Sequence, residues 1–244
     1  MSDLNLDVYI APMRRMKGAP RQGPGDEPTS SPMSATLIHG EEQAILIDTL
    51  LTFGQVDALA DWIDGFGKRL IGMYITHGHS DHWTGLTRLR ERLGPVPAWA
   101  RPKVRAVFEA TDPGLSGYWH TVFPGEIPQK RQPPDRLDTT PIELEGSEIR
   151  VIDIGQGDTV DSTIVHVPST VVSGHHRVSA PNDPKSIGES QQYLRDFSRV
   201  VETEDTVENI VVAMLEQHPD RDNTRVVWHC ARSGQEARPG VNSR

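Results

Sequence analysis

Hydrophobic and polar residues follow two periodicities along the chain, and each predicts a different kind of element. Apolar, partly β-branched runs on either side of Gly40, over 35–39 and 43–51, predict a β-hairpin. A continuous apolar run over 70–76 predicts a buried strand, and alternation over 141–154 predicts a second hairpin that turns at Gly146. Short strands are expected at 7–10 and 163–167.

Other segments have the spacing of amphipathic helices. Helices are expected over 53–66, 86–93, 184–201 and 206–217, and a strand followed by a helix over 96–110. The glycine and proline content of 111–134 predicts an irregular loop. Because helices interleave with hairpins rather than following every strand, the pattern favours a mixed α/β sandwich over a doubly wound parallel sheet. We expect a strand and a flexible, Gly/Pro-rich stretch over 1–34, a main domain over 35–232 and a polar tail over 233–244.

Composition narrows the functional classes. The chain has 244 residues, ten histidines, one cysteine and a formal net charge of −9. The single Cys230 excludes an internal disulfide framework and a cysteine-rich zinc module. The acidic balance, without a Lys/Arg stripe, argues against a nucleic-acid partner. No transmembrane segment or signal peptide is visible, so we expect a cytoplasmic protein that acts on a small molecule, in an oligomeric state left open.

Four residues of metal-binding types gather directly after the predicted buried strand. The segment THGHSDHWTG contains His77, His79, Asp81 and His82. Imidazole and carboxylate groups suit Zn, Fe or Mn. In an extended loop, His77 and His79 project to one side and can grip one ion, while Asp81 and His82 can point to a neighbouring position. The competing interpretation is a solvated loop, or a helix start capped by Asp81.

The HGHSDH segment, together with ILIDTL before it and LEGSEIRVIDIG after it, resembles the metallo-β-lactamase superfamily of metal-dependent hydrolases. The resemblance spans roughly residues 35–195 and implies an αββα sandwich with a metal site at the edge where two sheets meet. It implies that His77 and His79 bind a first zinc-type ion, and that Asp81, His82 and His175 bind a second. One or two ions, of zinc, iron or manganese, would activate water to attack an ester, lactone, thioester, amide or phosphoester, and Asp81 would help to orient the nucleophile.

The sequence departs from the family pattern at two places. Gln156 stands where the family has a third histidine of the first site, with Asp158 close by. The strand whose terminal Gly-Asp supplies the metal-bridging carboxylate is not evident. Either VVSGH is that strand with His175 replacing the aspartate, or VVSGH is the family's late Gly-His loop and an internal strand–helix block is missing. The helical segment that follows favours the second alignment.

These departures leave several hypotheses open. The chain is either a metal-dependent hydrolase or a catalytically impaired, truncated relative with weak or single metal binding. An iron-dependent, oxygen-using member of the same fold is a third reading. Asp48 is expected either to accept a hydrogen bond behind the metal loop or only to end a strand. Trp83 and the aromatic segment 118–123 either line a substrate pocket or pack into the core.

Overall fold

A computed structural model describes residues 4–21, 27–155, 159–167, 185–220 and 224–236. The chain divides into two compact units. The first comprises Met1–Pro168 with Val172–Ala180, and the second comprises Ser169–Val171 with Pro181–Arg244.

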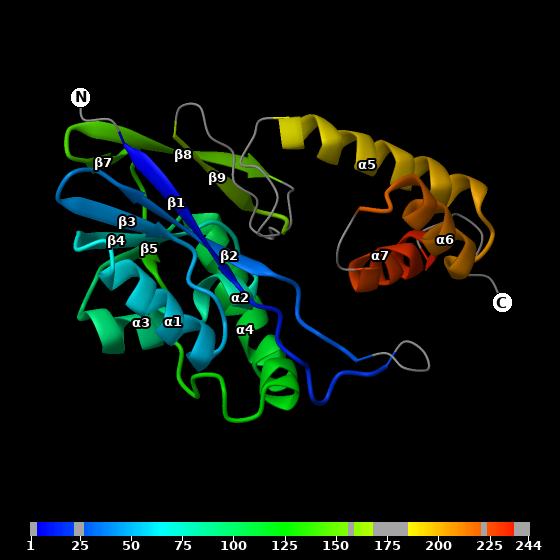
Figure 1. The fold of residues 1–244 in the computed structure, drawn as a ribbon, viewed down its shortest axis with the longest axis horizontal. Helices are drawn as coiled ribbons and strands as arrows, with labels where there is room; N and C mark the ends of the chain where they lie inside the picture. Colours follow the sequence, from blue (N-terminus) through cyan, green and yellow to red (C-terminus); the bar gives the residue numbers. More distant parts are fainter. Residues whose placement is uncertain (1–3, 22–26, 156–158, 168–184, 221–223, 237–244) are drawn as a thin grey trace. The chain divides into compact units, whose positions relative to one another are not determined.

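The first unit contains a six-stranded sheet (Figure 1). Its strands, in spatial order, are β1 (Asn5–Ala11), β2 (Met33–His39), β3 (Gln43–Ile47), β4 (Arg69–Ile75), β5 (Ala98–Ala100) and β6 (Asp135–Arg136). Neighbours from β1 to β3 are antiparallel, whereas β3 to β6 run parallel to one another. The hairpin predicted on either side of Gly40 is therefore confirmed, and the buried run that follows is the central strand β4.

Helices cover one face of this sheet. In Figure 1, α1 (Phe53–Asp64), α3 (Leu86–Leu93) and α4 (Pro102–Val122) lie on the same side of it. Helix α1 shows why: Val56, Leu59 and Ile63 recur at helical spacing and are buried in the core between helices and sheet. The short α2 (Ser80–Trp83) lies within the segment expected as a loop after β4.

The other face of the large sheet packs on a second, three-stranded antiparallel sheet. It consists of β7 (Ile142–Leu144), β8 (Ser147–Gly155) and β9 (Ser162–His166). Gly146 has φ 77°, a left-handed conformation that glycine adopts without strain, and it turns β7 into β8 as the alternation predicts. Ile45 and Tyr74 from one sheet and Ile149 and Val151 from the other share one buried cluster. The mixed α/β sandwich is confirmed.

The prediction of an irregular loop from residue 111 is wrong over its first half. Helix α4 continues to Val122. Val122 is buried, and Trp119 packs against the same core that buries Val104 and Phe108 near the start of the helix. This tertiary packing outweighs the low helix propensity of glycine and proline in the segment.

The described residues of the second unit form three helices, α5 (Lys185–Thr203), α6 (Val207–Gln217) and α7 (Thr224–Glu236). They enclose a core of their own, in which Val200, Ile210 and Val227 are buried. Thr206 precedes α6, and its side-chain oxygen accepts from the Asn209 amide, as expected for a helix cap. Helix α7 has no counterpart among the elements that the sequence pattern predicts.

Candidate metal-binding site

The histidine motif lies at the carboxyl edge of the parallel strands. Because β3 and β4 are parallel, the residues that follow them, Asp48 and Thr76–His77, emerge at the same edge of the sheet. In open α/β sheets this edge is where ligands bind. The parallel pairing of β3 and β4 thus brings Asp48 to within hydrogen-bonding distance of the motif.

Asp48 organises the rings behind the site. Its buried carboxylate accepts from the Thr76 amide (2.9 Å), the Thr76 hydroxyl (2.8 Å) and Nδ1 of His82 (2.7 Å). Burial acts to raise the pKa of the Asp48 carboxyl, but the neighbouring His82 and His77 rings and the Thr76 amide outweigh it, so that the pKa lies below its ordinary value. The expectation that Asp48 supports the metal loop from behind is the one that the geometry favours.

These bonds fix the tautomers of two histidines. An ionised carboxylate can only accept, so Nδ1 of His82 carries the proton that it donates to Asp48. The Thr76 hydroxyl already donates to Asp48, so Nδ1 of His77, 2.9 Å from that hydroxyl oxygen, donates to it. In the neutral form of each ring Nε2 then carries the lone pair, which is the form of imidazole that binds a metal.

The histidine rings of the motif lie close to one another. The ring centroids of His77 and His79 are 5.2 Å apart. Two imidazoles that bind one tetrahedral ion at about 2.0–2.1 Å have centroids about 5 Å apart, so this pair fits one ion. His77 and His82 approach to 3.9 Å between centroids, and Nε2 of His82 lies 3.9 Å from the Asp81 carboxylate. The motif thus brings its four predicted ligands together.

Within the described residues, no group of three or more histidine, cysteine or acidic side chains meets the geometry of a complete metal site. The remaining predicted ligand, His175, and the two candidates for the third position, Gln156 and Asp158, lie outside the described residues. The donor chemistry of the motif fits a metal ion, and Asp48 and Thr76 already hydrogen-bond the rings that would bind it. The described part of the chain supplies only some of the predicted ligands.

The turn that follows β3 holds the motif from behind. Asp48 and Leu50 both have left-handed backbones, with φ 60° and 64°. The Thr49 amide donates to the His82 carbonyl (2.8 Å), and the Gly85 amide donates to the Leu50 carbonyl (3.0 Å). A Cβ on Gly85 would lie 2.0 Å from the Thr49 carbonyl oxygen, so only glycine allows this approach.

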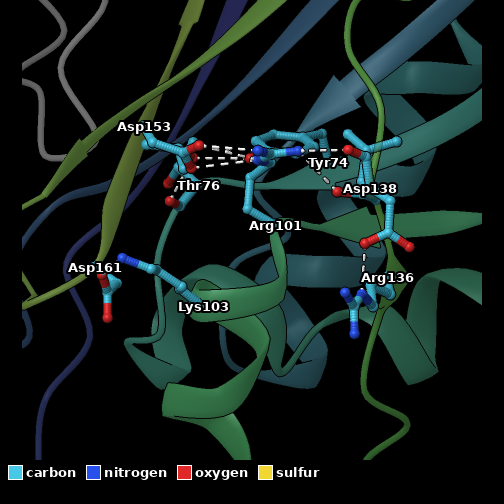
Figure 2. A network of polar contacts seen from close by, with 10 residues as sticks. Tyr74, Thr76, Arg101, Lys103, Arg136, Asp138, Asp153 and Asp161 are labelled. Atoms are coloured by element: carbon cyan, nitrogen blue, oxygen red, sulfur yellow. Dashed lines mark hydrogen bonds and ion pairs between the residues drawn. The ribbon is translucent and has the colours of Figure 1, made fainter.

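A polar network joins the two sheets beside the motif (Figure 2). Arg101, which precedes α4, donates to Asp153 of β8 (3.0 Å) and to the carbonyls of Leu137 and Asp138. Thr163 of β9 donates through its amide (3.0 Å) and its hydroxyl (2.7 Å) to the Thr76 carbonyl. Sequence reasoning missed Thr76 and Thr163, although the place of Thr76 directly before the motif was a signal for it.

Most of the aromatic residues expected either in a pocket wall or in the core pack into the core. Trp83 is buried and stacks on Phe108 with centroids 4.8 Å apart. Trp119 stacks on the buried Phe123 and packs against the helix-side core, while Tyr118 is exposed. Packing, rather than a pocket wall, accounts for Trp83, Trp119 and Phe123.

A mixed α/β sandwich with a histidine–aspartate motif at the carboxyl edge of its parallel strands is an architecture of metal-dependent hydrolases. The family model of the metallo-beta-lactamase superfamily matches residues 30–184, which is more than half of the chain. The chain therefore belongs to the metallo-beta-lactamase superfamily. Across the described residues, none of the helices combines the length and the apolar character needed to cross a membrane.

Several solved structures are similar to this chain at low sequence identity. A beta-lactamase domain protein from Burkholderia ambifaria is similar with a TM-score of 0.54 and 13% identity, over 91% of this chain and 83% of that one. A metallo-beta-lactamase from Pontibacter korlensis has a TM-score of 0.49 and 16% identity, over 97% and 100%. One from Pseudomonas aeruginosa, solved in its mono-zinc form, has 0.46 and 15%, over 94% and 91%. No curated protein matches the chain.

Proposed function

We propose that this chain is a hydrolase that uses one or two zinc-type ions to activate water against an ester, lactone, thioester, amide or phosphoester bond of a small molecule in the cytoplasm. The observation that carries the proposal is the pair of fixed tautomers. Asp48 and Thr76 engage Nδ1 of His82 and His77, and this makes Nε2 the metal-binding nitrogen of each ring. A merely solvated loop would not need two buried, oriented imidazoles.

In this proposal His77 and His79 hold the first ion, and Asp81, His82 and His175 hold the second. A bound ion of this kind lowers the pKa of its water to about 7, which supplies hydroxide at neutral pH. Asp81, whose side chain is 11% exposed, would accept a hydrogen bond from the nucleophile and so orient it. Asp48 keeps His82 in the tautomer that the site requires.

A second candidate is a family member that binds a single ion, or binds two weakly, and has impaired catalysis. Gln156 in place of a histidine supports it, because an amide oxygen is a weaker, neutral donor.

Metal content and hydrolysis separate the two candidates. The protein would be purified from zinc-supplemented medium, its metal measured per chain, and its activity tested on ester, lactone and phosphodiester substrates with added Zn²⁺ or Mn²⁺. His79→Ala should abolish metal-dependent turnover, whereas His166→Ala, at an exposed position of β9, should not. One tightly held ion, or two weakly held ions, without turnover would favour the impaired relative, whereas absence of metal from wild type would contradict both candidates.

A further inference from the structure

Among the described residues, Thr163 of β9 joins the second sheet by hydrogen bonds to Thr76, the first residue of the metal-binding motif. The Thr163 amide and hydroxyl both donate to the carbonyl oxygen of Thr76, at 3.0 and 2.7 Å. That carbonyl belongs to the peptide group that joins Thr76 to His77. Two donors from a buried side chain and its own backbone therefore fix the plane of the peptide from which the His77 side chain departs.

Tyr74 completes the arrangement from the first sheet. Its hydroxyl lies 2.8 Å from the Thr163 hydroxyl oxygen, and both side chains are buried. Since the Thr163 hydroxyl donates its one proton to the Thr76 carbonyl, Tyr74 is the donor in the bond between the two hydroxyls. Burial raises the pKa of the Tyr74 hydroxyl, so it keeps the proton that it donates. The chain of donors runs in one direction, from Tyr74 through Thr163 to Thr76.

Thr76 then has every polar group engaged. Its carbonyl accepts from Thr163, its amide and hydroxyl donate to Asp48, and its hydroxyl oxygen accepts from His77. Rotation of the Thr76–His77 peptide would break both bonds to β9, and a displacement of Thr76 as a whole would also break its bonds to Asp48. The loop therefore cannot reorient without losing contacts to β9 on one side and to the turn after β3 on the other.

We propose that Thr163 is a positioning residue for the proposed metal centre. By bonding the Thr76 carbonyl, Thr163 sets the orientation of His77, and this orientation determines the affinity of the first site, that of His77 and His79, for a zinc-type ion. This inference rests on the proposed function. A merely structural Thr163 would contribute to the stability of the sandwich without any effect on the metal.

The test uses Thr163→Val, which removes the hydroxyl but keeps the shape and the backbone amide, in the full chain. We expect the affinity for Co²⁺ and Zn²⁺, measured by competition with a chelator, to fall about 10- to 100-fold, as for other partners of metal ligands. The visible absorption of bound Co²⁺ should shift, and Thr163→Ser should restore both. Thr36→Val, a buried threonine of β2 opposite Val8 and Ile47, is the matched control and should leave the affinity unchanged.

A second measurement distinguishes this inference from the proposed function. In the metal-free protein, the ring nitrogen resonances of His77 should change in Thr163→Val. Those of His39, the last residue of β2, should not change. If wild type binds metal and Thr163→Val binds it equally well with unchanged His77 resonances, the positioning role is wrong and the proposed function stands. If wild type binds no metal, the proposed function and the predicted effect on affinity fail together. Unchanged His77 resonances would then refute the remaining orientation role as well.

Discussion

Replacing Asp48 by asparagine separates the hydrogen bonds of the carboxylate from its shape. Asparagine tolerates the left-handed backbone at this position, so the substitution adds little strain. The carboxylate accepts three hydrogen bonds, whereas the amide turns one of the two oxygens into a donor. Either the Thr76 amide or Nδ1–H of His82 must then face a second donor. An unsatisfied buried donor costs about 1–3 kcal/mol, and we expect that loss in the free energy of unfolding.

The substitution should also change the metal affinity. If His82 escapes the clash by moving its proton to Nε2, it loses the lone pair that the metal needs, so we expect affinity to fall about 10- to 100-fold. Urea unfolding of the metal-free protein can be followed by tryptophan fluorescence, because Trp62, Trp83, Trp99 and Trp119 all lie in the first unit. Asp153→Asn, at a half-exposed ion pair with Arg101, is the control and should cost at most about 1 kcal/mol. An Asp48→Asn protein as stable as this control, with wild-type metal affinity, would refute the reasoning.

Three further predictions follow from other contacts. Gly85→Ala should destabilise the first unit by several kcal/mol or prevent its folding, because the new methyl meets the Thr49 carbonyl at 2.0 Å, whereas Gly117→Ala, with open space around it, should unfold at or above the wild-type temperature. The backbone amides of Glu41, Glu42 and Gln43 hold the pKa of Glu145 below its ordinary value. The contribution of Glu145 to stability is therefore present above the unfolded-state pKa of about 4.3 and is lost as the pH falls through the lower folded-state pKa. The difference in unfolding temperature between wild type and Glu145→Gln should shrink as the pH falls below about 4.3, and a constant difference would contradict this. Thr206→Ala removes the cap of α6 and should cost the second unit about 1 kcal/mol, seen as reduced stability of its helical circular dichroism signal.

The parts of the fold that depend on local periodicity could be predicted from the sequence. The alternation around Gly146 and the apolar runs on both sides of Gly40 define hairpins because the period of a strand and the conformational freedom of glycine are local properties. The second half of α4 could not be predicted, since it depends on the burial of Trp119 and Val122 against strands that lie far away in the sequence. Helix propensity carries no information about such packing.

The candidate site divides in the same way. His77, His79, Asp81 and His82 stand within six residues and could be recognised as metal-binding types directly. The partners that orient them come from elsewhere: Asp48 is 34 positions from His82, and Thr163 is 87 positions from Thr76. Threonine is too common a residue for its role to be visible without the register between the sheets.

The left-handed turn at Asp48 and Leu50 has a consequence for how the site could be inherited. A non-glycine residue in this conformation is strained. The strain lowers the free energy of unfolding, and it costs nothing when a ligand binds, because the turn is already formed. At position 48 the backbone tolerates chiefly glycine, asparagine and aspartate, and of these only aspartate offers two acceptor oxygens to the motif. Two independent demands thus leave a single acceptable residue type. We therefore expect Asp48 to be substituted more slowly than its neighbours, even in a descendant whose substrate has changed.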